Sequence, residues 1–220
     1  HCEYMKRIHK NIIRKEDSDN MKEKNNKLTV PELISIGVFT ALYFVLVAIA
    51  TFLSAALLPG FSNVLLPAIA ALVAGCVYML MVSKVPHFGG ITVMGTVMGL
   101  FLFVSGHFAV SLIIGIGCSA LADFIAKLGG YRNKKGILAS YIVFSFGLTG
   151  PVLPLWLMKD AYIASLQAKG KDAAYIDGVF SHINGTTLVV CIAATLVLAI
   201  VGGMFGQKMM KKHFEKAGIV

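Results

Sequence analysis

The chain has 220 residues, of which 57% are hydrophobic and only 14% charged, and its formal net charge is +9. A soluble domain carries about 25% charged residues, so the composition excludes an ordinary soluble protein. The basic residues collect in short stretches between long apolar runs, which indicates membrane topology rather than a nucleic-acid surface. We therefore expect an all-α polytopic protein that lies in the lipid bilayer and binds no nucleic acid.

The N-terminal segment, residues 1–27, is polar and has no strong amphipathic pattern. We expect it to be a cytosolic tail outside the membrane domain. The sequence begins with His1 rather than with Met, which is consistent with a tag or a non-native extension, and both Met5 and Met21 are candidate native starts.

Residues 28–207 are expected to form one transmembrane domain of six helices. No charged residue occurs between Leu33 and Ser83, and none between Val85 and Ala122. A bilayer core of about 30 Å needs about 20 apolar residues in a spanning helix. The expected helices are residues 32–58, 63–83, 91–104, 108–128, 137–158 and 183–207. A basic cytosolic tail, residues 208–220, follows the last helix.

The charges in the connecting segments predict the orientation. Lys84, the loop Arg132–Lys135 and the tail Lys208–Lys212 are basic and share one side with the N-terminal tail. On the opposite side, the turns Pro59–Asn63 and Ser105–His107 contain no Lys or Arg. The positive-inside rule then predicts a multi-pass protein of a prokaryotic cell membrane with both termini in the cytosol.

Small residues recur at four-residue spacing in three of the expected helices, which favours close approach of helix backbones. They are Gly37 and Ala41, Gly95 and Gly99, and Ser111, Gly115 and Ser119. One interpretation is packing inside the chain, which suits Gly95 and Gly99 in the segment after the Lys84–Gly90 turn. The other is an interface with a partner protein, for which the candidates are Gly37, Ala41, Gly95 and Gly99.

Asp123 is the only acidic residue embedded in an apolar segment, and Lys127 follows it by one helical turn. This order of charges favours a local ion pair near the cytosolic end of the helix. The alternative is a proton relay, because acids inside membrane segments often have a function.

The expected helix 137–158 contains Pro151 and Pro154, each of which removes a backbone donor. Such a break in the outer half of the membrane is tolerated where the backbone lines a cavity, and it often marks a substrate site. An ordinary proline kink is the alternative. The long loop from Asp160 to His182 is expected to form two short amphipathic pieces around Gly170 and to act as a lid.

Polar and aromatic residues gather on the outer side, as in a small-molecule pocket or in an interfacial aromatic belt. The candidate substrate-binding residues are Asn63, His107, Phe108, Trp156, Tyr162, His182 and Asn184. The four cysteines have no metal-type spacing, and there is no phosphate-binding loop, zinc-protease motif or nucleophile elbow. We expect no catalytic residue, no metal site and no resident cofactor.

Three stretches resemble a known family: KLTVPELISIGVFTALYFVL (27–46), SKVPHFGGITVMGTVMGL (83–100) and SALADFIAKLGGYRNKK (119–135). Together with six helices and a length near 200 residues, they are similar to the S component of an energy-coupling factor (ECF) transporter, and more closely to the Trep_Strep group. The likeness extends from Lys27 to the C-terminus.

The resemblance implies a substrate-binding subunit that captures a micronutrient outside the cell. The ligand classes left open are a vitamin, a precursor, a tetrapyrrole and a chelated metal. The implied partners are a transmembrane T component and two ATPases. In the family, the first helix presents an Ala-x-x-x-Ala surface to the T component, and the matching residues here are Gly37 and Ala41. A self-sufficient secondary transporter or channel is the alternative, and a membrane enzyme would need catalytic pairs that the sequence lacks.

Overall fold

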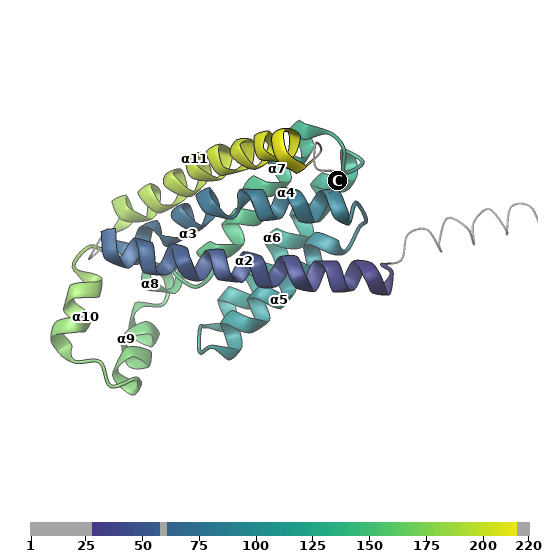
Figure 1. Ribbon diagram of the computed structural model, residues 1–220. Helices are drawn as coiled ribbons and strands as arrows, with labels where there is room; N and C mark the ends of the chain where they lie inside the picture. The colour runs from purple at the N-terminus through teal and green to yellow at the C-terminus, as the bar shows by residue number, and fades with distance from the viewer. Residues whose placement is uncertain (1–27, 58–60, 215–220) are drawn as a thin grey trace, which may run out of the picture.

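The computed structural model describes residues 28–57 and 61–214, and every regular element in these two ranges is helical. The predicted tail over residues 1–27, the predicted break at Pro59–Gly60 and residues 215–220 lie outside the described residues. Three apolar helices are each long enough to cross a membrane, and they run through the bundle in Figure 1. They are α2 (Val30–Leu57), α6 (Ala109–Leu128) and α11 (Gly185–Met209).

The other membrane segments are shorter or broken. α3 (Ser62–Val73) and α4 (Gly75–Lys84) form one apolar span bent by 47°, and α5 (Gly90–Val104) has 15 residues. α7 (Lys134–Ser145), the 3₁₀ turn η1 (Phe146–Thr149) and α8 (Pro154–Leu157) follow one another through the predicted fifth helix. The predicted all-α membrane fold is confirmed, and the six apolar segments occur in the predicted order.

The prediction of one continuous helix over residues 63–83 is wrong, because the chain breaks at Ala74. At this point the backbone of α11 lies against Gly75: an added Cβ there would overlap the carbonyl oxygen of Gly202. Pro67 also removes a backbone donor two turns before the break. The bend therefore occurs where glycine lets two helix backbones touch, a contact that the apolar pattern of the segment does not reveal.

Buried tyrosines connect the helices of the core. The Tyr78 hydroxyl on α4 lies 2.6 Å from the Ser140 hydroxyl on α7, and Ser140 in turn donates to the Ala122 carbonyl oxygen on α6. Tyr141 donates to the carbonyl oxygen of Ala71 on α3. Since hydrogen-bond partners are scarce inside a bilayer, these bonds fix the relative positions of four helices.

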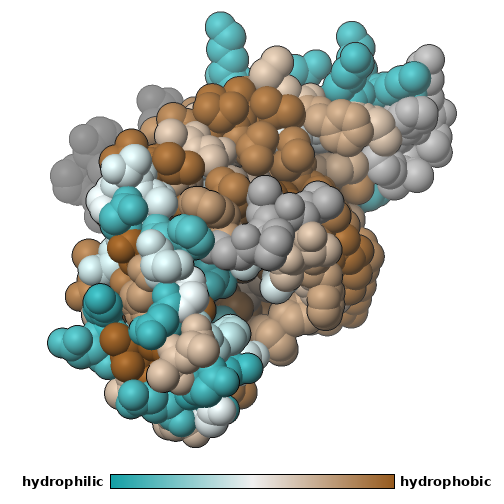
Figure 2. Space-filling view, turned by 90° about the vertical axis from the view of Figure 1, so that its left-hand side faces the viewer, coloured by the Kyte–Doolittle hydropathy of each residue, from teal (hydrophilic) through white to brown (hydrophobic). Residues whose placement is uncertain are grey.

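Two short helices, α9 (Lys159–Ala168) and α10 (Ala173–Phe180), project from one end of the bundle (Figure 1). They are joined at Gly170, whose φ of +74° glycine adopts without strain. The predicted pair of helices around Gly170 is confirmed. Figure 2 looks onto this end and shows hydrophilic residues gathered over the two helices, with hydrophobic surface on the flank of the bundle.

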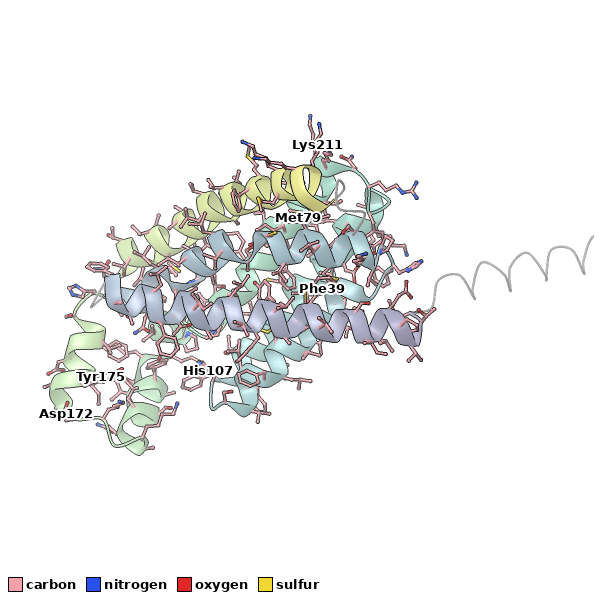
Figure 3. The ribbon with its side chains drawn as sticks, in the orientation of Figure 1. Phe39, Met79, His107, Asp172, Tyr175 and Lys211 are labelled. Atoms are coloured by element: carbon pink, nitrogen blue, oxygen red, sulfur yellow. The ribbon has the colours of Figure 1, made fainter. Side chains whose placement is uncertain are left out.

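The opposite end of the bundle is basic and contains both ends of the described chain (Figure 1). Lys211 lies there, whereas Asp172 lies at the α9–α10 end (Figure 3). The predicted basic tail begins as helix, because α11 continues to Met209 and a π-helical turn, η2 (Met210–Phe214), follows it. The described basic residues at this end are all exposed: Lys84, Lys127, Arg132, Lys134, Lys135, Lys208, Lys211 and Lys212.

Candidate functional site

A cavity of about 270 Å³ lies between α2, α3, α5 and η1, toward the α9–α10 end of the bundle. Its walls are almost entirely apolar, with Phe44 and Phe52 from α2 and Phe101 from α5. The polar groups are His107 and Thr51, and the Thr51 hydroxyl donates to a carbonyl oxygen of its own helix at 2.9 Å. Figure 3 shows His107 at the turn after α5, on the side where α9 and α10 lie. Such a cavity suits an apolar or aromatic body with few polar groups.

The broken fifth segment forms one wall of this cavity. Leu148 in η1 and Pro151, which follows it, both line the cavity. The backbone is irregular between Thr149 and Pro154, and Gly150 lets it approach α6, since an added Cβ there would lie 2.8 Å from Cα of Ser111. The prediction of a broken helix in this region is therefore confirmed, and the break borders a cavity.

Aromatic side chains join α9 and α10 to the bundle. The Tyr162 ring on α9 stacks on Phe108 with 5.7 Å between centroids, and it meets the edge of Phe180 on α10. The Trp156 indole N–H donates to the Asn184 carbonyl oxygen at 2.9 Å, which connects α8 to the start of α11. Burial raises the pKa of Tyr162, so the ring stays neutral in this cluster.

Of the seven predicted substrate-binding residues, the structure brings only His107 to the cavity. His182 stacks on Phe61, with 4.5 Å between ring centroids. The Asn184 side chain caps α11, and Asn63 is half-buried in the first turn of α3. The remaining three, Phe108, Trp156 and Tyr162, belong to the aromatic contacts around α8 and α9.

Sequence reasoning missed most of the cavity wall. Ala48 and Ala70 leave space between α2 and α3, and Leu66, Leu102 and Phe101 close it from the sides. The available signal was weak: small residues and one threonine inside long apolar runs look the same whether they face a cavity or a neighbouring helix.

A second depression, an apolar groove of about 450 Å³, runs between α2 and α5 on the flank of the bundle. Gly37 and Ala41 on α2 both line it and are exposed. A Cβ added at Gly37 would have no atom of the described residues within 4 Å, so α2 is not packed closely against another described helix at this point. Val97 and Phe101 of α5 form the opposite wall.

The prediction that Gly95 and Gly99 belong to a partner interface is wrong. Both are buried, and they lie on the face of α5 that packs against α6. An added Cβ at Gly95 would lie 2.5 Å from the Ser119 hydroxyl oxygen, and one at Gly99 would lie 3.3 Å from Leu112. Their spacing produces close packing inside the chain, the first of the two interpretations of this pattern.

The comparisons with known proteins agree with this architecture. The family described as "Hypothetical bacterial integral membrane protein (Trep_Strep)" matches residues 30–216. The chain belongs to the Trep_Strep family. The resemblance to that family in three sequence stretches is thereby confirmed. The chain is an integral membrane protein of a bacterial family. It matches no curated protein and no solved structure.

In this Trep_Strep protein, Asp123 is fully buried and accepts four hydrogen bonds. One carboxylate oxygen accepts from the backbone N–H groups of Gly89 and Thr92 and from the Thr92 hydroxyl, at 2.8–3.0 Å, and the other accepts from the Tyr131 hydroxyl at 2.7 Å. Burial, together with this bond, raises the pKa of Tyr131, which keeps it a neutral donor. The predicted ion pair with Lys127 is wrong, since the Lys127 ammonium lies over the Phe88 ring, 4.7 Å from its centroid.

Proposed function

We propose that this chain is the substrate-binding S component of an ECF-type ABC importer. The observation that supports it best is the exposed groove between α2 and α5, with Gly37 and Ala41 in its wall. Small residues on an exposed membrane helix let another helix approach closely, so the groove suits a transmembrane partner. In this proposal the partner is the T component, and two separate ATPases supply ATP hydrolysis. The chain itself is a transport subunit and not an enzyme.

The outer cavity would hold the transported solute. Its volume of about 270 Å³ lies just below the usual range for small-molecule pockets, which begins at about 300 Å³, and this favours a vitamin or precursor over a tetrapyrrole. α9 and α10 are joined to the turn that carries His107, because the Lys169 ammonium donates to the Gly106 carbonyl oxygen at 3.2 Å. They would therefore act as a lid over the solute.

The charge distribution supports an orientation with the α9–α10 end outside the cell. The exposed basic residues of the opposite end would face the cytosol, as the positive-inside rule requires. The solute would then enter from the extracellular side, and both termini would be cytosolic.

Affinity purification from native membranes, with this protein as bait, tests the proposal. Recovery of a multi-helix T protein together with two ATPases, identified by mass spectrometry, is the expected result. Recovery of the chain alone, in detergents that preserve known complexes of this kind, would contradict it. That outcome would favour the alternative, a self-sufficient secondary transporter or channel.

A further inference from the structure

A small internal void lies at the centre of the bundle, between α2, α5, α6 and the α7–η1 segment. Tyr43 and Ser111 both line it, and the hydroxyl groups of these two residues have no hydrogen-bond partner among the described residues. Both residues are buried, with exposed fractions of 1% for Tyr43 and 0% for Ser111. Each hydroxyl can donate one hydrogen bond and accept others, so two of the residues around the void have unused donors and acceptors.

These two residues are exceptions in this bundle. The buried hydroxyl of Thr40, one turn before Tyr43 on the same helix, donates to the Ile36 carbonyl oxygen at 2.7 Å. The equally buried Tyr141 hydroxyl donates to the Ala71 carbonyl oxygen. Leaving a hydroxyl unpaired in an apolar interior is unfavourable, and native proteins rarely do it without a water or ligand in place. It is therefore significant that both exceptions line the same void.

The void exists because glycine supplies much of its wall. Its lining includes four glycines, from α5, α6 and η1: Gly95, Gly99, Gly115 and Gly147. The space measures about 20 Å³, which is enough for one water-sized group and no more. None of the described residues that line it is charged, and an unpaired charge would be strongly disfavoured there. The occupant must be neutral and about the size of one oxygen or nitrogen with its hydrogens.

We propose that this void is a binding site for one neutral hydrogen-bonding group, held between the Tyr43 and Ser111 hydroxyls. The group is either a buried water molecule or the hydroxyl or amide end of a solute. Leu102 and Leu148 line both this void and the outer cavity, so the two spaces are adjacent. A solute whose apolar body lies in the outer cavity would place its polar end here. The assignment of the group to a solute rests on the proposed function, whereas the binding site itself does not.

Thermal unfolding of the purified chain in detergent tests the site. We compare wild type with Tyr43→Phe, Ser111→Ala and the double variant. If the site is occupied, each single variant loses a hydrogen bond and lowers the melting midpoint by about 2–4 °C. Because both hydroxyls would hold one occupant, the double variant should lower it by less than the sum of the two. Tyr141→Phe is the matched control, since it removes a tyrosine hydroxyl whose partner is known.

An unchanged or raised midpoint in either single variant would overturn the proposal, because removing a hydroxyl that binds nothing is neutral or stabilising. If the double variant lowers the melting midpoint by the sum of the two single variants, the two hydroxyls do not hold one shared occupant. Mass spectrometry of solvent extracts from the same samples then distinguishes the two sources. A small molecule present in wild type and depleted at least fivefold in Tyr43→Phe identifies a solute, and lowered midpoints without any such molecule identify water. These measurements use the isolated chain, so failure to recover a T component would not affect them.

Discussion

At the scale of single residues, Asp123 is the clearest case of a charged group with a structural role. Its carboxylate joins α6 to the start of α5 through Gly89 and Thr92, and to the following loop through Tyr131. Gly89 has a φ of +102°, so the turn before α5 has a backbone that glycine adopts readily, and the carboxylate holds it in place. Hydrogen bonds to an ionised acceptor are stronger than those between neutral groups. Asp123 therefore fixes the geometry of the turn Lys84–Gly90.

We predict that Asp123→Asn lowers the free energy of unfolding by about 2 kcal/mol, because the amide keeps one acceptor oxygen but replaces the other with a donor. Denaturant or thermal unfolding in detergent measures this change. Lys127→Ala is the control and should change the free energy of unfolding by less than about 1 kcal/mol, since the exposed Lys127 ammonium lies over the exposed Phe88 ring. A larger effect of Lys127→Ala than of Asp123→Asn would restore the ion-pair interpretation.

The sequence predicted that Asp123 is structural but not what binds it. The acid stands alone in an apolar run with Lys127 one turn later, which favoured a local ion pair over a proton relay. Its main partners, Gly89 and Thr92, lie 34 and 31 positions earlier in the chain. Helical spacing shows only neighbours three or four positions away, so it selected Lys127, whose side chain turns to Phe88 instead.

At the scale of helices, the contact between the α3–α4 bend and α11 depends on glycine. An added Cβ at Gly206 would lie 2.6 Å from the Gly75 carbonyl oxygen, and one at Gly202 would overlap the Ala71 carbonyl oxygen. These are backbone atoms of a packed helix, so they cannot move aside as a flexible side chain can. Glycines four positions apart on α11 thus serve the same purpose as Gly95 and Gly99 on α5.

We predict that Gly202→Ala lowers the free energy of unfolding by about 3 kcal/mol, because one methyl group forces α3 and α11 apart. The yield of monodisperse protein in detergent and the thermal midpoint measure this loss. Gly117→Ala is the matched control, since it changes a glycine of α6 with no atom within 4 Å of the new Cβ. Equal behaviour of the two variants would show that the α3–α11 contact is looser than described.

The hydrogen bond from Trp156 to Asn184 connects α8, which precedes α9 and α10, to the start of α11. We predict that Trp156→Phe, which keeps the aromatic bulk but removes the N–H group, increases local opening of the α9–α10 segment about fivefold. Limited trypsin digestion should then cut faster after Lys169 and Lys171. Cleavage after Lys84, at the other end of the bundle, is the internal control and should keep its wild-type rate; if it accelerates equally, the effect is global.

Helix positions were predictable to within a few residues, whereas the helix breaks were predictable only in part. Pro151 and Pro154 predict the break in the fifth segment, because proline has no backbone N–H to donate to a helical hydrogen bond. The break at Ala74 depends on Gly75 meeting Gly202, a contact between segments more than 120 positions apart. Gly202 and Gly206 also lie four positions apart, a pair that the sequence prediction did not include; such spacing indicates a close helix contact but not with which helix.

At the scale of the whole molecule, the groove and the cavity occupy different parts of the bundle. The groove extends from Leu33 to Val45 along α2, and the cavity extends from Phe44 to Phe52 of the same helix. The two share Phe44 and Phe101, whose rings are 4.2 Å apart and close the space between them. A partner seated in the groove would therefore touch the wall of the cavity. The sequence suggested both functions, yet it could place only Gly37, Ala41 and His107, because cavity walls arise from several helices at once.

The proposed function predicts that the two parts can be disabled separately. Gly37→Leu should reduce recovery of the T component and ATPases at least tenfold, because it fills the groove from an open position, where an added Cβ meets no atom within 4 Å. Ala48→Trp should leave that recovery unchanged, because it fills the outer cavity instead, and should deplete any small molecule that is extracted with the wild-type protein. Affinity purification followed by mass spectrometry of proteins and of solvent extracts measures both effects in one experiment.

The matched control for bulk is Gly117→Leu, which adds the same side chain to α6, where a new Cβ also meets no atom within 4 Å. It should behave as wild type in both measurements, and this separates a specific docking surface from a general effect of bulk on the lipid-facing flank. Equal loss of partners in Gly117→Leu and Gly37→Leu would contradict a docking surface on α2. Loss of partners in Ala48→Trp would show instead that the Phe44–Phe101 contact transmits changes in the cavity to the groove.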